Sequence, residues 1–563
     1  MSERSGAGVL LPLGVSLVPP MLLAGWWWGW ADGGGGLAWL GWMLYWWMPL
    51  TCAFAALCFW WRWRAREASL RETARAWWPG LVLAIVAVVV VVLLSPPQMR
   101  VQFDETSLVG VSQNMHLQRH AVMTTGAIPF EGRPFPLENM VDKRPTLFAF
   151  ACSLVHDVAG YRLANAFFVN QALLLVGLFA AFVAVRRRLG LLAGLAAPLL
   201  LLAVPLTGVV ATSAGFELLA TVLLLLTTIA ALAFVERPDE PRFAALLGCS
   251  ALFAQARYES LPAMALLGGL VWLAVRRRFA PTARCWWLLA AIPTLVTPLF
   301  FLVQHAQDPH FTPEAAGRTL VSLGNLVEHT GAFFTEMFAP SLRNPLPGAV
   351  AIVGVLAFGW RVASGRTSRV DLLVAAPALA ITLLVLAWFY GDAADPTAMR
   401  LFLPFVWLVA LAPLALVPQL PRRGAAVVLA LAAVLAPLRL WQLVDGRAFP
   451  TLEMASLTGA LDGAVARLPG DRATTLWVGA PAQHLIVKGH AAVSVRTFQR
   501  LGRRIAQLQR QGDLGAIYLI ETPIDRAMAP AFGAPREVLQ RYASQVVERV
   551  GGRMPVTVHR LGR

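Results

Sequence analysis

Two acidic residues, Asp104 and Glu105, stand side by side shortly after an apolar run at 81–94. A carboxylate next to low-dielectric surroundings has a raised pKa, which suits a general base. The polar stretch that begins at this pair ends in Lys143 and Arg144. Lysine and arginine side chains both bind phosphate, one as a compact charge and the other as a planar fork. The sequence therefore predicts proton transfer beside a bound phosphate.

Each of these residues also has a simpler interpretation. Asp104 is a plausible N-cap of the helix that follows it. Function is favoured because Lys143 is one of only two lysines in the chain, the other being Lys488.

Charged residues at the ends of other apolar runs extend the candidate site. Arg257 lies between two apolar runs and Arg400 directly precedes another. Charged side chains at membrane depth are costly and usually functional, so Arg257 is a candidate for binding the same phosphate. The alternatives are a surface turn for Arg257, an arginine that snorkels to the interface for Arg400, and an ordinary helix-end charge for Glu217. Further candidates for lining the same cavity are Glu217, Tyr258, Glu259 and Asn114.

These residues must be positioned by membrane helices. The chain is 58% hydrophobic and only 14% charged, with a mean hydropathy of +0.62. Apolar runs long enough to cross a bilayer recur along it and predict an all-α polytopic membrane protein of about 13 transmembrane helices. The predicted spans are 8–30, 37–61, 79–95, 163–185, 189–207, 215–235, 243–257, 261–275, 286–303, 346–362, 371–390, 401–419 and 424–442.

Positive charge gives the orientation. Short arginine-rich loops at 62–75, 186–188, 276–278, 361–369 and 422–423 all fall on one side of the predicted membrane. The positive-inside rule makes that side cytoplasmic, so the loops 96–162 and 304–345 and the tail face outward. The net charge of +16 thus reports topology and lipid contact, and no nucleic-acid-binding module is expected.

The chain divides into three regions. Residues 1–78 are expected to form two helices and a basic cytoplasmic loop, 79–442 the main helical domain, and 443–563 an extracytoplasmic α/β domain. Within the first outward loop we expect an in-plane helix from Asp104 to about Thr125 and a second over 146–158. The glycines and prolines of 126–141 predict irregular coil between them. In the tail we expect strands at 474–478, 491–498, 516–521 and 556–558, with helices at 452–468, 500–512 and 537–550.

The order and spacing of the loop residues resemble the glycosyltransferase C (GT-C) superfamily. The resemblance is to its bacterial branch of lipid A aminoarabinose transferases and protein O-mannosyltransferases, and it covers about 79–190. The chain departs from the usual pattern at Lys143-Arg144-Pro145-Thr146, which leaves open whether Lys143 or Arg144 meets the phosphate. It also has two apolar helices before the motif-bearing one. The matching motifs are Phe103-Asp104-Glu105, Gln113-Asn114-Met115, Gly126-Ala127-Ile128-Pro129-Phe130, Lys143-Arg144-Pro145-Thr146-Leu147 and Gly160-Tyr161-Arg162 with Asn165 and Asn170.

The resemblance implies an enzyme of the bacterial cytoplasmic membrane with an extracytoplasmic active site. It would move a sugar, with inversion, from a polyprenyl phosphate to a hydroxyl of a lipid, glycan or protein of the cell envelope. Asp104 would take the acceptor proton, and Lys143 or Arg144 would stabilise the leaving phosphate. Glu105 would position the acceptor, or would hold a divalent metal ion (Mg²⁺ or Mn²⁺) together with Asp104. Arg400 resembles the arginine at the outward start of a late helix of the superfamily, which can reach the lipid phosphate. Two alternatives are a secondary transporter and a non-catalytic scaffold of envelope assembly.

Overall fold

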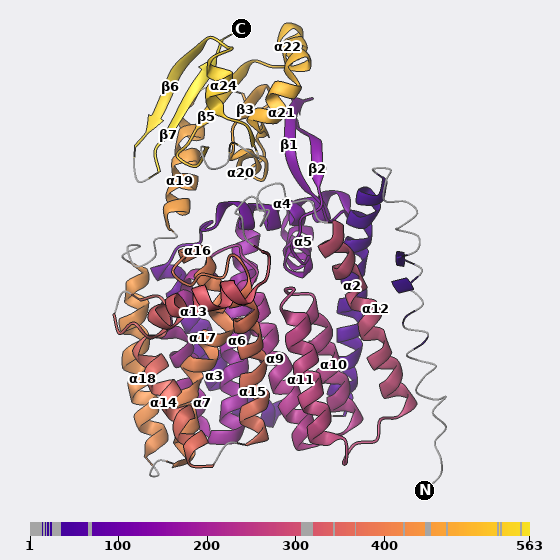
Figure 1. Cartoon of the computed structure of the whole chain (residues 1–563), viewed down its shortest axis with the longest axis vertical. Helices are drawn as coiled ribbons and strands as arrows, with labels where there is room; N and C mark the ends of the chain where they lie inside the picture. The colour runs from indigo at the N-terminus through magenta and orange to yellow at the C-terminus, as the bar shows by residue number, and fades with distance from the viewer. Residues whose placement is uncertain are drawn as a thin grey trace.

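The computed structural model shows an elongated protein with a helical body at one end and a smaller sheet domain at the other (Figure 1). It describes residues 35–65, 70–305, 319–341, 344–365, 368–419, 423–444, 452–468, 471–525, 532–551 and 554–562, with isolated positions 14, 17, 20, 21, 23, 24 and 529. The first predicted span, 8–30, therefore lies almost wholly outside the described residues.

The helical body is built from apolar helices that run along the long axis (Figure 1). Buried aliphatic and aromatic side chains form one continuous core through most of it. The helices are α2 (Gly35–Arg64), α3 (Leu70–Leu94), α6 (Ala164–Leu189), α7 (Leu191–Leu202), α8 (Pro205–Ala211), α9 (Glu217–Glu236), α10 (Glu240–Ala254), α11 (Ser260–Val275), α12 (Ala283–His305), α13 (Leu323–Phe338), α14 (Ala349–Ala363), α15 (Arg369–Ala387), α16 (Pro396–Met399), α17 (Leu403–Leu411) and α18 (Gly424–Leu440), with 3-10 turns η3 (Arg400–Phe402), η4 (Ala412–Gln419) and η5 (Trp441–Leu443).

Among the described residues, eight helices are long and apolar enough to cross a membrane, or nine if a bent pair counts as one span. The bent pair is α7 and α8, which meet at 73° where one helix was predicted over 189–207. Pro205 at the start of α8 explains the break, because proline lacks the N–H that would continue the preceding helix. The region 243–275 forms two helices, α10 and α11. The total of 13 spans remains a prediction.

The predicted basic loops lie at the end of the body away from the sheet domain. Arg188, at the end of α6, forms an ion pair with Glu236 at the end of α9. Arg278 donates a hydrogen bond to the Val235 carbonyl at 3.0 Å, and Arg361 pairs with Asp371 at 2.9 Å. The first two contacts join the arginine-rich loops after α6 and α11 to the end of α9, and the third closes the turn between α14 and α15.

Two helices form a roof over the other end of the body. They are α4 (Gln102–Gln118) and α5 (Leu147–Ala159), which lie across the bundle below the sheet domain (Figure 1). A helix was predicted in each of these two segments, although α4 is shorter than expected. The predicted coil at 126–141 is wrong, because strands β1 (Met123–Phe130) and β2 (Arg133–Met140) pair there as an antiparallel hairpin. Glu131 and Gly132 turn the chain at φ values of 48° and 76°.

The C-terminal domain holds a five-stranded sheet in the order β4-β3-β5-β7-β6. Strands β4, β3 and β5 are parallel, and β7 and β6 continue the sheet antiparallel. Two predictions in this domain are wrong: 537–550 is mostly strand β6, and 491–498 is a short strand followed by helix α21. The elements are α19 (Leu452–Arg467), β3 (Thr475–Val478), α20 (Ala482–Ile486), β4 (Ala491–Val493), α21 (Val495–Arg500), α22 (Gly502–Gln511), β5 (Ala516–Glu521), α24 (Pro535–Leu539), β6 (Ser544–Val550) and β7 (Val556–Leu561).

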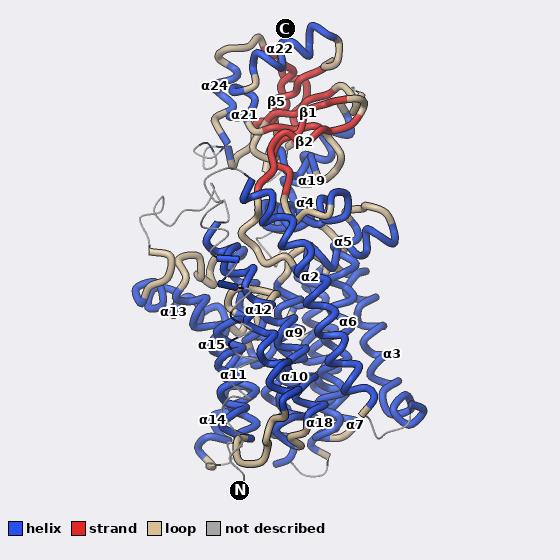
Figure 2. The backbone as a smooth tube through the Cα atoms, turned by 90° about the vertical axis from the view of Figure 1, so that its right-hand side faces the viewer, coloured by secondary structure: helices blue, strands red, loops and turns tan. Residues whose placement is uncertain are grey.

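The hairpin joins the roof to the C-terminal domain. Strand β1 lies beside β4 and β3, and Figure 2 shows β1 and β2 next to β5 of the same domain. Ala127 belongs to the apolar cluster on one face of the sheet, and Ile128 to the cluster on the other. Glu138 of β2 forms an ion pair with Arg500 and accepts a hydrogen bond from Thr497 at 3.0 Å. Since α4 leads directly into β1, the C-terminal domain is anchored to the helix that carries Asp104.

Candidate active site

Asp104 lies where the roof meets the helical body, between two arginines. One carboxylate oxygen pairs with Arg144 and the other with Arg400. Arg400 also pairs with Glu217 at 2.8 Å. Arg400 and Glu217 are buried, whereas the Asp104 side chain is 26% exposed. Residues far apart in the sequence thus form one charge cluster, of which only the Asp104 end is substantially open to solvent.

The electrostatics of Asp104 differ from the sequence prediction. Burial alone raises the pKa of its carboxyl, but the charges and hydrogen bonds of Arg144 and Arg400 outweigh burial. They hold the pKa of Asp104 well below its usual range, so the predicted rise is wrong for the free protein. Asp104 is therefore ionised at neutral pH and is a weak base in the free protein.

Local structure explains how each charge reaches the cluster. Asp104 lies in the first turn of α4, whose N-cap is Val101, so the predicted N-cap role of Asp104 is wrong. Arg144 is fixed from behind by Asp142, whose carboxylate accepts its hydrogen bond at 2.6 Å. Arg400 follows the short helix α16, whose N-cap Asp395 accepts a hydrogen bond from the Thr397 N–H at 2.7 Å.

Glu105 points away from this cluster. Its carboxylate accepts hydrogen bonds from the backbone N–H groups of Arg100, Val101 and Ala214, at 3.1, 3.2 and 3.1 Å. It therefore joins the start of α4 to the loop before α9. Burial raises the pKa of Glu105 to about 7, against the opposing effect of its backbone hydrogen bonds with Ala214 and Arg100. These contacts give Glu105 an anchoring position.

Lys143 and Arg257 are held nearby by the turn between α10 and α11. The hydroxyl of Tyr258 donates a hydrogen bond to the Lys143 carbonyl, which fixes the loop that carries both predicted phosphate-binding cations. Arg257 pairs with Glu259 at 2.8 Å and lies over the Phe216 ring, 5.1 Å from its centroid. Phe216 directly precedes Glu217, so this second charge pair borders the first.

Asn114 has a structural contact. Its side-chain amide donates hydrogen bonds to the Val122 carbonyl at 2.9 Å and to the Thr124 hydroxyl at 3.1 Å. These bonds connect α4 to the start of β1. Asn114 is buried in these contacts, on the hairpin side of the roof.

The carboxylates of Asp104 and Glu105 do not fit a shared metal ion. The three backbone N–H groups on Glu105 occupy its two oxygens, and two guanidinium groups occupy those of Asp104. Hard divalent cations need several free oxygen ligands around one point. Within the described ranges, no cluster of three or more His, Cys, Asp or Glu residues is arranged to hold a metal ion.

Sequence reasoning missed two charged residues of this region. Arg100 is buried, and its guanidinium donates hydrogen bonds to the Ser95 and Thr212 hydroxyls at 2.7 and 2.8 Å. Asp142 supports Arg144 from a buried position. The sequence signal for Arg100 was its place just after an apolar run, and the signal for Asp142 was its position next to Lys143. One further contact could not be predicted from the sequence. Phe103 stacks on Phe532 of the C-terminal domain, with ring centroids 5.8 Å apart.

Comparison with solved structures identifies the architecture. The crystal structure of ArnT from Cupriavidus metallidurans bound to undecaprenyl phosphate aligns with a TM-score of 0.53 and 14% identity, over 85% of this chain and 97% of that chain. Its apo form aligns with a TM-score of 0.54 and 15% identity, over 86% and 98%. An Archaeoglobus fulgidus oligosaccharyltransferase, tethered with an acceptor peptide, aligns more loosely, with a TM-score of 0.42, 12% identity, and coverage of 84% and 73%.

The sequence matches no protein-family model and no curated protein. The structural match to ArnT covers 85–86% of this chain and 97–98% of that chain. The chain has the GT-C fold, as the loop motifs predicted.

Proposed function

We propose that this protein is an integral membrane glycosyltransferase that uses a polyprenyl-phosphate sugar as donor. The acceptor is a hydroxyl of a cell-envelope lipid, glycan or protein, and the reaction takes place on the extracytoplasmic face of the bacterial cytoplasmic membrane. The observation that carries the proposal is the carboxylate of Asp104, held at the rim of a membrane bundle by two arginines. The fold shared with ArnT, whose crystal structure contains undecaprenyl phosphate, supports the choice of donor.

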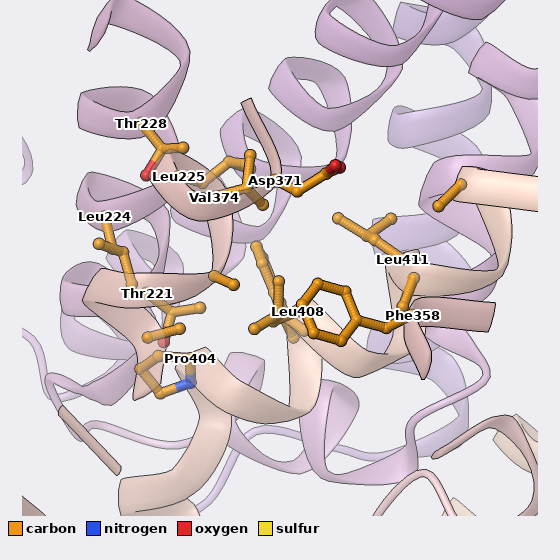
Figure 3. Close-up of a pocket in the computed structure, with 15 residues that line it drawn as sticks. Thr221, Leu224, Leu225, Thr228, Phe358, Asp371, Val374, Pro404, Leu408 and Leu411 are labelled. Atoms are coloured by element: carbon orange, nitrogen blue, oxygen red, sulfur yellow. The ribbon is translucent and has the colours of Figure 1, made fainter. Parts of the chain in front are cut away.

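An apolar cavity beneath the cluster suits the lipid part of such a donor. It has a volume of about 200 Å³ and lies between α9, α14, α15 and α17. Thr221 and Pro404 lie toward one end and Thr228 toward the other (Figure 3). Thr221 and Pro404 each follow a charged residue of the cluster, Glu217 and Arg400, by about one helical turn. A lipid phosphate bound at the arginines would therefore have apolar surface directly below it.

The charges suit a single displacement. As the acceptor oxygen attacks the anomeric carbon, its proton passes to the carboxylate of Asp104. The bond between that carbon and the phosphate oxygen breaks, and its electron pair remains on the phosphate. Arg144 and Arg400 stabilise the added negative charge, an electrostatic contribution that is usually large in enzymes. Attack opposite the leaving phosphate inverts the configuration of the sugar.

The arginine pairs also connect donor binding to base strength. A donor phosphate that shares Arg144 and Arg400 would weaken their hold on Asp104. The pKa of Asp104 would then rise from its depressed value toward the range of an effective base. The free enzyme would keep its base ionised but weak, and donor binding would strengthen it.

The direct test replaces Asp104 by Asn. We expect Asp104→Asn to insert and fold normally but to lose sugar transfer by roughly 10²- to 10⁴-fold in kcat, the usual contribution of a positioned general base. The matched control is Asp157→Asn, since that roof carboxylate is also 26% exposed and also pairs with an arginine, Arg119. Transfer would be measured with purified enzyme, a radiolabelled polyprenyl-phosphate sugar and an envelope extract. Asp104→Asn at wild-type rates would remove Asp104 from the reaction.

A further inference from the structure

A second cavity lies on the other side of the roof, beneath the C-terminal domain. It has a volume of about 670 Å³, within the range of ~300–1,000 Å³ found for ligand pockets. Its lining comes from α4, the turn before α6, α19, β3, α20, β5 and the turn before β4. The Tyr161 hydroxyl donates a hydrogen bond to the Val487 carbonyl at 2.6 Å, which joins the two domains at its wall. The lining includes none of the charged residues of the candidate active site.

The cavity carries more positive than negative charge. Its charged lining residues are Arg472, Lys488 and Asp462. Lys488, the second of the two lysines in the chain, pairs with Asp462, which also binds the His484 ring at 2.9 Å. Arg472 is exposed. Two cations against one carboxylate favour an anionic ligand.

The uncharged lining combines aromatic and polar groups. Trp477 and Tyr518 are register partners on β3 and β5, and their rings stack with centroids 4.9 Å apart. Gln113, Thr475 and His490 add hydrogen-bonding groups around them. Aromatic rings, amide and hydroxyl groups together suit a molecule that has many hydroxyls and an apolar ring face. With the excess positive charge, this chemistry matches an acidic saccharide.

The position of the cavity relative to Asp104 follows from helix geometry. Gln113 comes nine residues after Asp104 on α4, which is about 13 Å along the axis and half a turn around it. The cavity and the charge cluster therefore lie on opposite sides of the same helix. A ligand in the cavity can present a hydroxyl at Asp104 only if it extends around α4.

We propose that this cavity binds an acidic saccharide portion of the acceptor, at a distance from the hydroxyl that receives the sugar. The inference rests on the proposed function and adds to it the chemical class of the acceptor. Contacts so far from the reacting atoms are the same in the ground state and the transition state. They lower KM for the acceptor and leave kcat unchanged.

The first test is binding to the full-length protein in nanodiscs, measured by isothermal titration calorimetry. The probes are a trisaccharide of galacturonic acid, neutral maltotriose and inorganic phosphate. We expect the acidic trisaccharide to bind, and the neutral sugar and free phosphate to bind far more weakly. Equal binding of maltotriose would overturn the role of the charges. No binding of either saccharide would overturn the site, and phosphate binding alone would identify a simple anion site instead.

Variants locate that binding in the cavity. Arg472→Gln and Lys488→Gln should each lower the affinity for the acidic trisaccharide by about tenfold, which is the usual effect of losing a hydrogen bond to a charged group. Arg472 is exposed, so its replacement changes charge without disturbing the core. The control is Arg503→Gln on α22, an exposed arginine outside the cavity. If the control weakened binding as much as Arg472→Gln, the effect would be one of net charge and the site would be refuted.

The second test separates this inference from the proposed function. With an envelope extract as acceptor, Arg472→Gln should raise KM for the acceptor several-fold at unchanged kcat, while release of donor sugar to water stays at the wild-type rate. An unchanged KM would refute the cavity and leave the transferase proposal intact. A wild-type protein that neither transfers sugar nor hydrolyses the donor would refute the transferase proposal and the acceptor role, with saccharide binding decided by the titration.

Discussion

Arg400 balances two carboxylates at once, because its buried guanidinium contacts both Asp104 and Glu217. Removing it would leave Glu217 as a buried charge without this partner. Breaking a buried pair in this way costs about 3–5 kcal/mol. We expect Arg400→Gln to lower the free energy of unfolding by this amount and to abolish transfer.

The double variant Arg400→Gln, Glu217→Gln separates the two effects. Neutralising both partners removes the unpaired charge, so thermal stability in detergent should recover most of the loss while transfer stays absent. Recovery of activity together with stability would show that Arg400 acts only through folding.

Glu105 predicts a pH dependence near neutrality. Burial raises the pKa of Glu105 to about 7, so the folded protein holds this proton more tightly than the unfolded chain does. Its contribution to stability is therefore fully present below the unfolded pKa of about 4.3 and is lost as the pH rises through about 7. The melting temperature should fall between about pH 5 and pH 7 in the wild type, level off at higher pH, and be flatter over this range in Glu105→Gln. A wild-type profile without this fall would contradict the shift.

Asp104 acts in the opposite sense. The arginines depress its pKa, so its contribution is present above the unfolded value and is lost only as the pH falls through the lowered folded value. The two acidic neighbours thus change stability in separate pH windows. The loss of stability that Asp104 causes at low pH can therefore be distinguished from the loss that Glu105 causes as the pH approaches 7.

At the scale of elements, the hairpin β1–β2 is the part of the loop 96–162 that packs against the C-terminal domain. Ile128 of β1 is 4% exposed and packs into the core behind the sheet, whereas Phe130 on the same strand is 48% exposed. Ile128→Ala should destabilise this junction by about 2–5 kcal/mol through a cavity, and Phe130→Ala by much less. Limited proteolysis would report release of the C-terminal domain. Equal protease resistance in both variants would argue against a rigid junction.

Elements with strong local signals could be predicted from the sequence, and those set by tertiary contacts could not. The long apolar helices and the roof helices were predicted, and the order of the loop motifs predicted the fold. The hairpin was missed because Gly126, Pro129 and Pro134 indicate coil, and its pairing with the C-terminal domain comes from a distant part of the chain. Strand β6 was predicted as helix because Glu548 and Arg549 suit either structure in isolation.

The charge cluster shows the same division. Asp104, Arg144 and Arg400 were each chosen from their place at the end of an apolar run. That Arg144 and Arg400 both contact Asp104, and lower its pKa, depends on a contact between residues almost 300 positions apart. The anchoring contacts of Glu105 depend on backbone N–H groups, which carry no sequence signal.

At the scale of the whole molecule, the predicted orientation can be tested by chemical labelling. The five cysteines all lie in helices, four of them buried, so they should react slowly with a charged maleimide. A cysteine introduced as Arg503→Cys in the C-terminal domain should be labelled in intact spheroplasts. One introduced as Arg277→Cys at the opposite end should be labelled only after lysis. The reverse pattern would place the charge cluster in the cytosol and refute the proposed function.

The hairpin inside the sheet domain also imposes an order on synthesis. Strand β1 ends at Phe130, but its neighbour β3 begins only at Thr475. At ordinary translation rates this interval is roughly 20 to 70 s, during which Ala127 and Ile128 lack their packing partners in the C-terminal domain. A part of the chain that is made much later therefore completes the apolar core that the hairpin begins. A polypeptide that stops short of it would carry an uncovered apolar ribbon outside the bilayer, where chaperones and proteases can recognise it.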